Sequence, residues 1–132
     1  MHPYRRLTVW QKAHTLALET HRCAERISWR EFPGLADQLR RAAMSIPANI
    51  AEGCGRDTAP QFLHFLQIAI ASAREVDYFL LLAADLQAIT RVEHARLEAR
   101  TDEVARMLVG LRSSVRARNQ VRTNKSAAKT ET

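Results

Sequence analysis

The chain has 132 residues, 46% of them hydrophobic, and a net charge of +6. This length suits one domain with its own core, and two distant cysteines, Cys23 and Cys54, exclude a disulfide-stapled scaffold and favour a reducing compartment. The longest apolar run, residues 78–84, is far shorter than the roughly 20 residues of a membrane span. The first residues lead into no apolar segment, so we expect no signal peptide and a cytoplasmic protein without membrane association.

The first predicted helix covers about residues 9–27, where apolar residues recur at steps of four and three. It opens on residues 8–11, which have the T-x-x-E/Q pattern of a capping box, in which the threonine hydroxyl accepts a backbone amide. The same pattern opens at Thr58 and at Thr90. Three such tetrapeptides before periodic segments predict three helix starts.

The second predicted helix covers about residues 35–52 and contains Pro47, which we expect to kink it. Two glycines, Gly53 and Gly55, predict its end. The third, about residues 59–88, carries two adjacent apolar stripes. That arc is wider than one surface helix needs, so this helix either is central or packs in part on another subunit.

The fourth predicted helix covers about residues 91–118. Its inward stripe again steps by four and three: Leu97, Thr101, Val104, Leu108, Leu111 and Val115. No strand pattern competes, so the sequence predicts an all-α protein, an antiparallel four-helix bundle over residues 1–119. Residues 120–132 are polar and small, which predicts a disordered basic C-terminal tail.

Residues 40–53 read RRAAMSIPANIAEG, and residues 9–13 read VWQKA. Together with residues 65–69, Ser72 and Glu75, these segments resemble a bacterial family of four-helix-bundle proteins first noticed as reading frames in intervening sequences of 23S rRNA genes. Ala71 and Cys54 depart from the usual pattern, which favours glycine and a larger residue there. The resemblance covers roughly residues 7–115.

The resemblance implies a homopentamer of bundles, and it implies no established activity. A related branch, the accessory protein of diversity-generating retroelements, forms a basic pentameric barrel that engages nucleic acid and a reverse transcriptase. By analogy, RNA or DNA is an expected partner of this chain.

Positive charge gathers at the C-terminal end. Residues 1–111 hold 14 Lys and Arg against 13 Asp and Glu, whereas residues 112–132 hold six cations against one acid. A basic arm favours nucleic acid or another anionic surface, and a solubilising tail is the alternative. The predicted nucleic-acid-binding residues are Arg112, Arg116, Arg118, Arg122, Lys125 and Lys129. We expect Arg116, Arg118, Arg122 and Lys125 to lie off the inward stripe.

A polar stripe follows the second helix at steps of four, four, three and four: Arg41, Ser45, Asn49, Glu52 and Arg56. One interpretation is a surface that binds phosphate or a partner. The other is a seam between subunits, in which Ser45 and Asn49 serve backbone groups freed by Pro47. We favour the seam, because Glu52 would repel phosphate.

No catalytic or metal-binding constellation is expected. His14, His21 and Cys23 lack the spacing of three or four convergent ligands, and Cys54 follows a helix C-terminus, where the dipole raises a thiol pKa. The glycine-rich residues 53–56 lack the Lys-Ser/Thr of a phosphate loop. The aromatic residues form no visible platform for stacking bases. We therefore expect no catalysis, cofactor or metal.

The sequence thus predicts a non-catalytic homo-oligomeric bundle that binds RNA or RNA/DNA through backbone charge contacts. The alternative is a protein–protein interaction scaffold with no nucleic-acid role, in which a partner protein replaces the nucleic acid.

Overall fold

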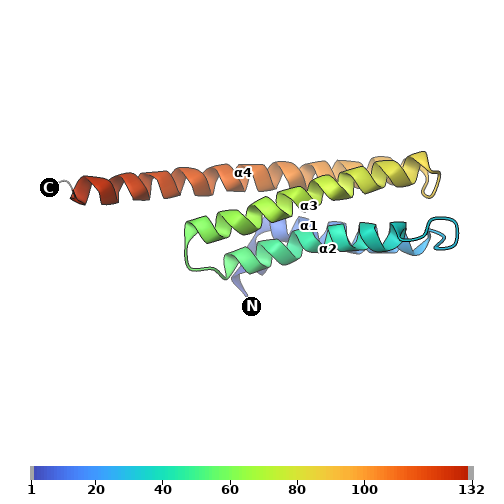
Figure 1. The fold of residues 1–132 in the computed structure, drawn as a ribbon, viewed down its shortest axis with the longest axis horizontal. Coiled ribbons are helices and arrows are strands. Elements are labelled where there is room, and N and C mark those ends of the chain that lie inside the picture. The colour runs from blue at the N-terminus through green and yellow to red at the C-terminus, as the bar shows by residue number, and fades with distance from the viewer. Residues whose placement is uncertain (1, 131–132) are drawn as a thin grey trace.

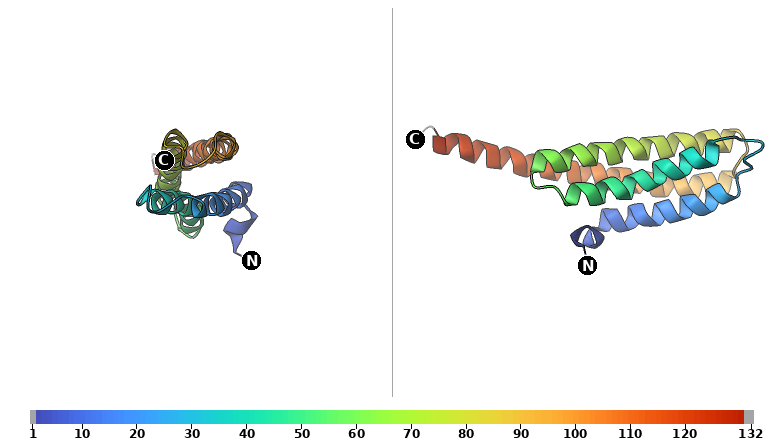
Figure 2. Two further views of the ribbon diagram at one scale, coloured as in Figure 1. Left: turned by 90° about the vertical axis from the view of Figure 1, so that its right-hand side faces the viewer. Right: turned by 60° about the horizontal axis from the view of Figure 1, so that its bottom comes forward.

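A computed structural model describes residues 2–130 of the chain. A short 3-10 helix, η1 (Pro3–Arg6), precedes four α-helices: α1 (Thr8–Glu25), α2 (Leu35–Cys54), α3 (Ala59–Asp85) and α4 (Arg91–Thr130). Residues 2–130 contain no strand. Successive helices run in opposite directions and pack side by side, and α4 closes the bundle against α1 (Figures 1 and 2). The all-helical prediction is confirmed.

All four helices contribute side chains to one hydrophobic core. The predicted inward stripes of α1 and α4 are buried, except that Leu111 is half-buried. Spacing of four and three keeps one face of each helix turned inward, so leucines and isoleucines from facing helices interdigitate. The largest fully buried side chains include Leu16, Leu39, Ile46, Ile50, Leu66, Leu80, Leu97 and Leu108.

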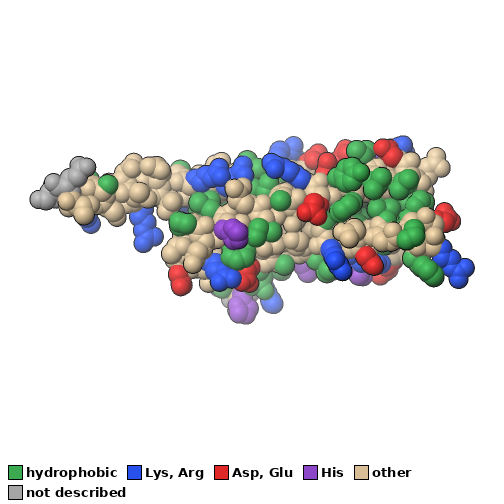
Figure 3. Space-filling view, viewed as in Figure 1, with side chains coloured by type: hydrophobic (Ala, Val, Ile, Leu, Met, Phe, Trp, Pro, Cys, Tyr) green, Lys and Arg blue, Asp and Glu red, His purple; other side chains and the backbone are tan. Residues whose placement is uncertain are grey.

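The second apolar stripe of α3 is only partly covered. Phe65, Ile68, Phe79 and Leu82 are not fully buried, and Leu86, just beyond the helix, is exposed. Figure 3 shows hydrophobic side chains gathered over the second half of α3, at the end of the bundle remote from the C-terminus of α4. One bundle therefore buries one of the two stripes, which leaves the other available for contact with another molecule.

The three predicted helix starts lie within one residue of those observed, and two of the three predicted threonine caps are confirmed. The Thr58 hydroxyl accepts the Gln61 amide at 3.3 Å, and the Thr90 hydroxyl accepts the Glu93 amide at 3.1 Å. The cap predicted at Thr8 is wrong, because Leu7 occupies the N-cap and makes no side-chain cap. Since η1 leads directly into α1, the preceding chain is folded close by, and the Gln11 side-chain amide donates to the Arg5 carbonyl instead.

The end of α4 differs from the predicted disordered tail. The helix continues to Thr130, and residues 131–132 lie outside the described part of the chain. No glycine or proline follows Gly110, and the Arg, Lys, Gln and Ala residues there favour helix. Cations near a helix C-terminus also complement its dipole. The basic segment is therefore a continuation of the fourth helix, and the boundary predicted at Asn119 is not a break in structure.

Candidate nucleic-acid interface

The last part of α4 extends beyond the bundle. Val115 is the last buried residue of the helix, and from Arg116 to Thr130 every side chain is exposed except half-buried Asn119. We call residues 116–130 the arm. Figures 1 and 2 show it projecting past the ends of the other three helices. Tertiary burial therefore ends where the basic segment begins.

Four cations on the arm share one face. Arg118, Arg122, Lys125 and Lys129 step by four, three and four. At about 100° per residue, they fall within an arc of roughly 60°. We call them the cationic row. Arg116 lies on the far side of the helix by the same count.

The cationic row continues the inward stripe of α4. The step from Val115 to Arg118 is three, so the alternation of four and three that starts at Leu97 runs unbroken to Lys129. Our expectation that the basic side chains lie off this stripe is therefore wrong for Arg118, Arg122 and Lys125. The stripe is apolar where helices cover it and cationic where they do not. The row faces the side on which the rest of the bundle lies.

Three cations of the row, Arg118, Arg122 and Lys125, have no acidic residue near them along the helix. No Asp or Glu occurs between Glu103 and Glu131. Within residues 2–130, Arg122 and Lys125 make no hydrogen bond or ion pair, and Arg118 donates only to Ser114 of its own helix, at 3.4 and 3.5 Å. The charges of Arg122 and Lys125 therefore remain available to an external anion.

Arg112 has a different environment from the other predicted cations. It is half-buried, and its guanidinium donates to the side-chain oxygen of Gln67 on α3 at 3.0 Å. This contact ties α4 to α3 where the bundle ends. The structure thus separates the six predicted residues into the cationic row, an anchor at Arg112 and an outward cation at Arg116.

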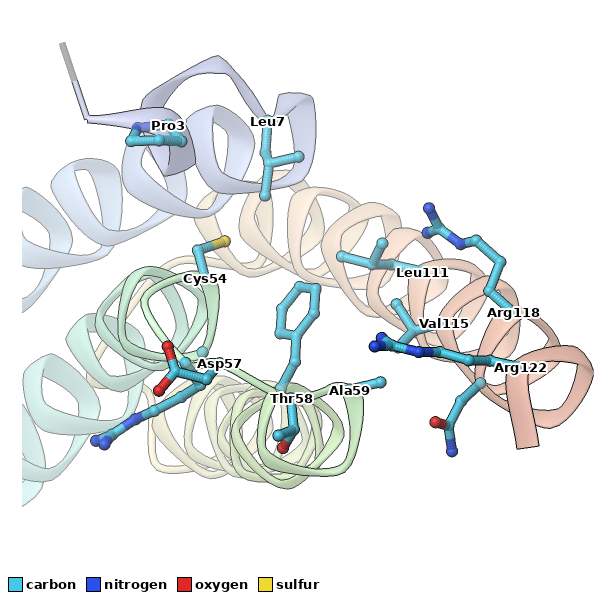
Figure 4. A pocket seen from close by; sticks show the side chains of 14 residues that line it. Pro3, Leu7, Cys54, Asp57, Thr58, Ala59, Leu111, Val115, Arg118 and Arg122 are labelled. Atoms are coloured by element: carbon cyan, nitrogen blue, oxygen red, sulfur yellow. The ribbon is translucent and has the colours of Figure 1, made fainter. Parts of the chain in front are cut away.

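A cavity of about 510 Å³ opens at the root of the arm. It lies where the N-terminal segment, the end of α2, the start of α3 and α4 converge (Figure 4). We call it the end cavity. Its wall is largely apolar, with Leu7, Phe62, Leu111 and Val115, and Arg118 and Arg122 line it from the arm. Figure 4 shows the Arg122 side chain extending from α4 towards the cavity.

Neither cysteine is activated. Burial raises the pKa of the half-buried Cys54 thiol, which lines the end cavity. Cys23 is fully buried, and its pKa rises to about 12, first because of burial and then because of the nearby Glu93 carboxylate. A thiol with a raised pKa holds little thiolate at neutral pH, and thiolate is the nucleophile. Residues 2–130 also contain no group of three His, Cys, Asp or Glu side chains that could hold a metal ion.

The polar stripe of α2 lies partly against α3 of the same chain. The Ser72 hydroxyl of α3 donates to the Ser45 hydroxyl at 2.8 Å, and the Asn49 amide donates to the same hydroxyl at 3.0 Å and to the Ser45 carbonyl at 2.8 Å. The helix runs unbroken through Pro47, and the carbonyl that this proline leaves without its amide is that of Ala43. Ser45 therefore joins α2 to α3, and Asn49 bonds to it from within α2; these hydrogen bonds do not reach the freed Ala43 carbonyl.

The end of the stripe packs more closely still. Gly53 faces α3, where an added Cβ would lie 2.9 Å from the Phe62 ring and 3.0 Å from the Phe65 Cβ. Arg56 pairs with Glu52 and stacks over the Phe65 ring, its guanidinium carbon 4.8 Å from the ring centre. The requirement for glycine here is steric, and Arg56 is engaged within the chain. Arg41, at the other end of the stripe, is exposed.

No helix within residues 2–130 combines the length and the apolar character that crossing a membrane requires. The row and the end cavity adjoin, so one surface of the described chain is cationic along the arm and apolar at its root. The spacing from Val115 to Lys129 could have revealed the row. The cavity depends on how four segments meet, which no single-segment pattern records.

Comparison with known proteins supports the resemblance drawn from residues 40–53. Residues 5–110 match the 23S rRNA-intervening sequence protein family. Among solved structures, a protein with unknown function of the S23 ribosomal protein family from Bacteroides thetaiotaomicron is 25% identical, with a TM-score of 0.74 over 79% of this chain and 97% of that one. A comparison with curated proteins finds no match. The family match ends before the arm.

Proposed function

The chain belongs to the 23S rRNA-intervening sequence protein family, and we propose that it is a non-catalytic, homo-oligomeric helical-bundle protein that binds nucleic acid, RNA or RNA/DNA, through charge contacts with the backbone. The family and its solved structural neighbour carry no assigned activity. The proposal therefore rests on features of this chain.

One observation carries the nucleic-acid part of the proposal: the cationic row. To complement the helix dipole, cations are needed only in the last turn of the helix. The cationic row instead spans more than three turns and stays on one face of the helix. Phosphate oxygens are the common acceptors for such side chains and give affinity without reading sequence. The row lies outside residues 5–110, so it is a property of this chain beyond the matched family segment.

The non-catalytic part of the proposal draws on the chemistry of the two cysteine thiols. Burial raises the pKa of both. A nucleophile needs an adjacent base or a lowered pKa, and neither accompanies Cys54. Binding is the chemistry that the surface supports.

Oligomerisation is supported by two different apolar surfaces. Trp10, Leu18, Met44 and Pro47 line a cavity of about 500 Å³ between α1 and α2, and Tyr78 and Leu81 are exposed on α3. Two unlike surfaces suit heterologous contacts, which close a ring when the rotation permits. We propose a ring of five subunits, in which the α1–α2 surface of one subunit packs on the α3 face of the next.

We expect light scattering to give a mass close to five times the 15.0 kDa of one chain. Met44→Glu should dissociate the ring, because Met44 is 54% exposed in one chain and its replacement would bury a charge at the proposed contact. The matched control is Val92→Glu, since Val92 is 79% exposed and lies on neither surface. A monomer mass for the unmodified protein at micromolar concentration would overturn the ring.

Exposed apolar surfaces also suit the alternative function, an interaction scaffold whose partner is another protein. Salt dependence distinguishes the two functions. In an oligomer the cations of each arm act together, so weak phosphate contacts gain by multivalency, and the electrostatic term falls steeply as salt rises.

A gel-shift titration of the nuclease-treated protein with oligonucleotides tests the proposed function. We expect a shift at about 50 mM salt, where the electrostatic term is strong, and its loss as salt rises, with a linear log–log dependence. If no oligonucleotide shifts at about 50 mM salt, the nucleic-acid function fails and the scaffold takes its place.

A further inference from the structure

We infer that the cationic row and the end cavity form one site for single-stranded nucleic acid, with the phosphates of one strand along the row and an unpaired base in the cavity. This inference rests on the proposed function and specifies its ligand. It follows from where the row begins, how narrow it is and what lies at its root.

The narrowness of the row favours one backbone. Its four cations occupy an arc of roughly 60° on the helix, and the outward side carries only Arg116 between Val115 and Thr130. A helix that enters a duplex groove has a phosphate backbone on each side, and cations on both flanks serve them. A single row can follow a single strand.

The end cavity can accommodate an unpaired base, which a single strand offers in addition to its phosphates. Its volume, about 510 Å³, falls within the range of roughly 300–1,000 Å³ typical of small-ligand sites. The half-buried Phe62 lines it, and Arg122 extends towards it (Figure 4). Aromatic rings and guanidinium planes are the usual stacking partners of unpaired bases, and they accept every base. A base inside a duplex would first have to leave its stack, which costs a few kcal/mol.

An acidic helix from a partner protein fits the same surface less well. Helices pair through apolar residues at the seam positions. After Val115 these positions are all occupied by Arg or Lys, and Val121 lies off the row. A partner helix would have nothing to bury along the arm, whereas a phosphate backbone needs only charge. A small free anion would leave most of the row unused.

The Cys54 thiol reports directly on the cavity. It lines the wall and is half-buried, whereas Cys23 is 0% exposed, so a thiol-alkylating reagent should modify Cys54 alone in the native protein. The test compares alkylation rates of the full-length protein alone, with a 15-nucleotide oligothymidylate, and with a duplex of equal length. At a strand concentration of about ten times its Kd, occupancy should slow alkylation about tenfold, and the duplex should leave the rate unchanged.

Two variants make the result specific. Arg122→Gln should reduce the protection from about tenfold to about threefold at the same strand concentration, because one lost phosphate contact weakens binding about fivefold at 0.1 M salt. Arg116→Gln deletes the same charge on the far side of the helix and should retain the full protection. Both arginines are exposed and make no hydrogen bond or ion pair within the described residues, so both variants should fold.

The outcomes separate this inference from the proposed function. If duplex and single strand bind equally, or if bound single strand leaves Cys54 reactive, the single-strand site is refuted and nucleic-acid binding stands. If neither binds, both fail. Because burial raises the pKa of the Cys54 thiol, the rates are measured in alkaline buffer. A Cys54 that stays unreactive there in the free protein would show that the cavity is closed, and that would also overturn the inference.

Discussion

Gly53→Ala should destabilise the protein, although alanine is the better helix former. The new Cβ would lie 2.9 Å from the Phe62 ring and 3.0 Å from the Phe65 Cβ. The Phe65 Cβ is fixed to the backbone of α3, so it can move only if the helix moves. Overpacking of this kind costs about 1–3 kcal/mol, more than the gain of roughly 0.5–1 kcal/mol that alanine brings to a helix interior. Gly53→Val should cost more than Gly53→Ala.

Gly110 provides the matched control. It lies within α4 and is exposed, and a Cβ added there would meet no atom within 4 Å beyond its own helix. Gly110→Ala should therefore stabilise the fold by about 0.5–1 kcal/mol. Urea unfolding followed by circular dichroism measures both. Equal effects of the two substitutions would refute the steric account of Gly53.

The helices were predictable from sequence because their periodicity is a local property. Apolar steps of four and three, with Thr58 and Thr90 before two of the helices, placed the helix starts close to those observed. The cap predicted at Thr8 failed because the preceding η1 determines how α1 begins. That helix lies outside the tetrapeptide on which the prediction relied.

The disorder predicted for the C-terminal tail was wrong over residues 120–130 for a related reason. Low hydrophobicity after Asn119 indicates that nothing is buried there, and it says little about backbone conformation. An existing helix extends at little cost through residues with good helix propensity, because the unfavourable nucleation step is complete. The arm is therefore helical in the structure. Side chains also hydrogen-bond to its backbone, as the Thr123 hydroxyl does in donating to the Asn119 carbonyl at 2.9 Å.

The candidate site was predictable only in part. The six cations were evident from sequence, but their division into a row, an anchor and an outward cation depends on helix register and on the Gln67 partner of Arg112. The end cavity joins residues from both ends of the chain, such as Leu7 and Leu111. Only the tertiary structure places such residues together, and it also assigns Ser45 to contacts between α2 and α3.

Charge removal from the row should have the largest effect on binding. In Arg122→Gln/Lys125→Gln each subunit loses two cations that have no partner within the described residues. Each phosphate contact contributes about −0.7 to the log–log salt slope on single strands and about −0.9 on duplex DNA. With one arm engaged, the magnitude of the log–log salt slope should therefore fall by about 1.4 on single strands and about 1.8 on duplex DNA. This change corresponds to an affinity about 25-fold to 60-fold lower at 0.1 M salt. Several engaged arms would multiply the loss.

Arg106→Gln/Arg116→Gln is the charge-matched control for this variant. Both arginines are exposed on α4, neither belongs to the row, and neither makes a hydrogen bond or ion pair within residues 2–130. If net charge alone governs binding, the two double variants lose affinity equally, and the row has no special part. If the row binds the backbone, only Arg122→Gln/Lys125→Gln flattens the slope, while circular dichroism and mass stay unchanged for both. The position of charge on the helix, relative to the stripe that begins at Leu97, is what this comparison measures.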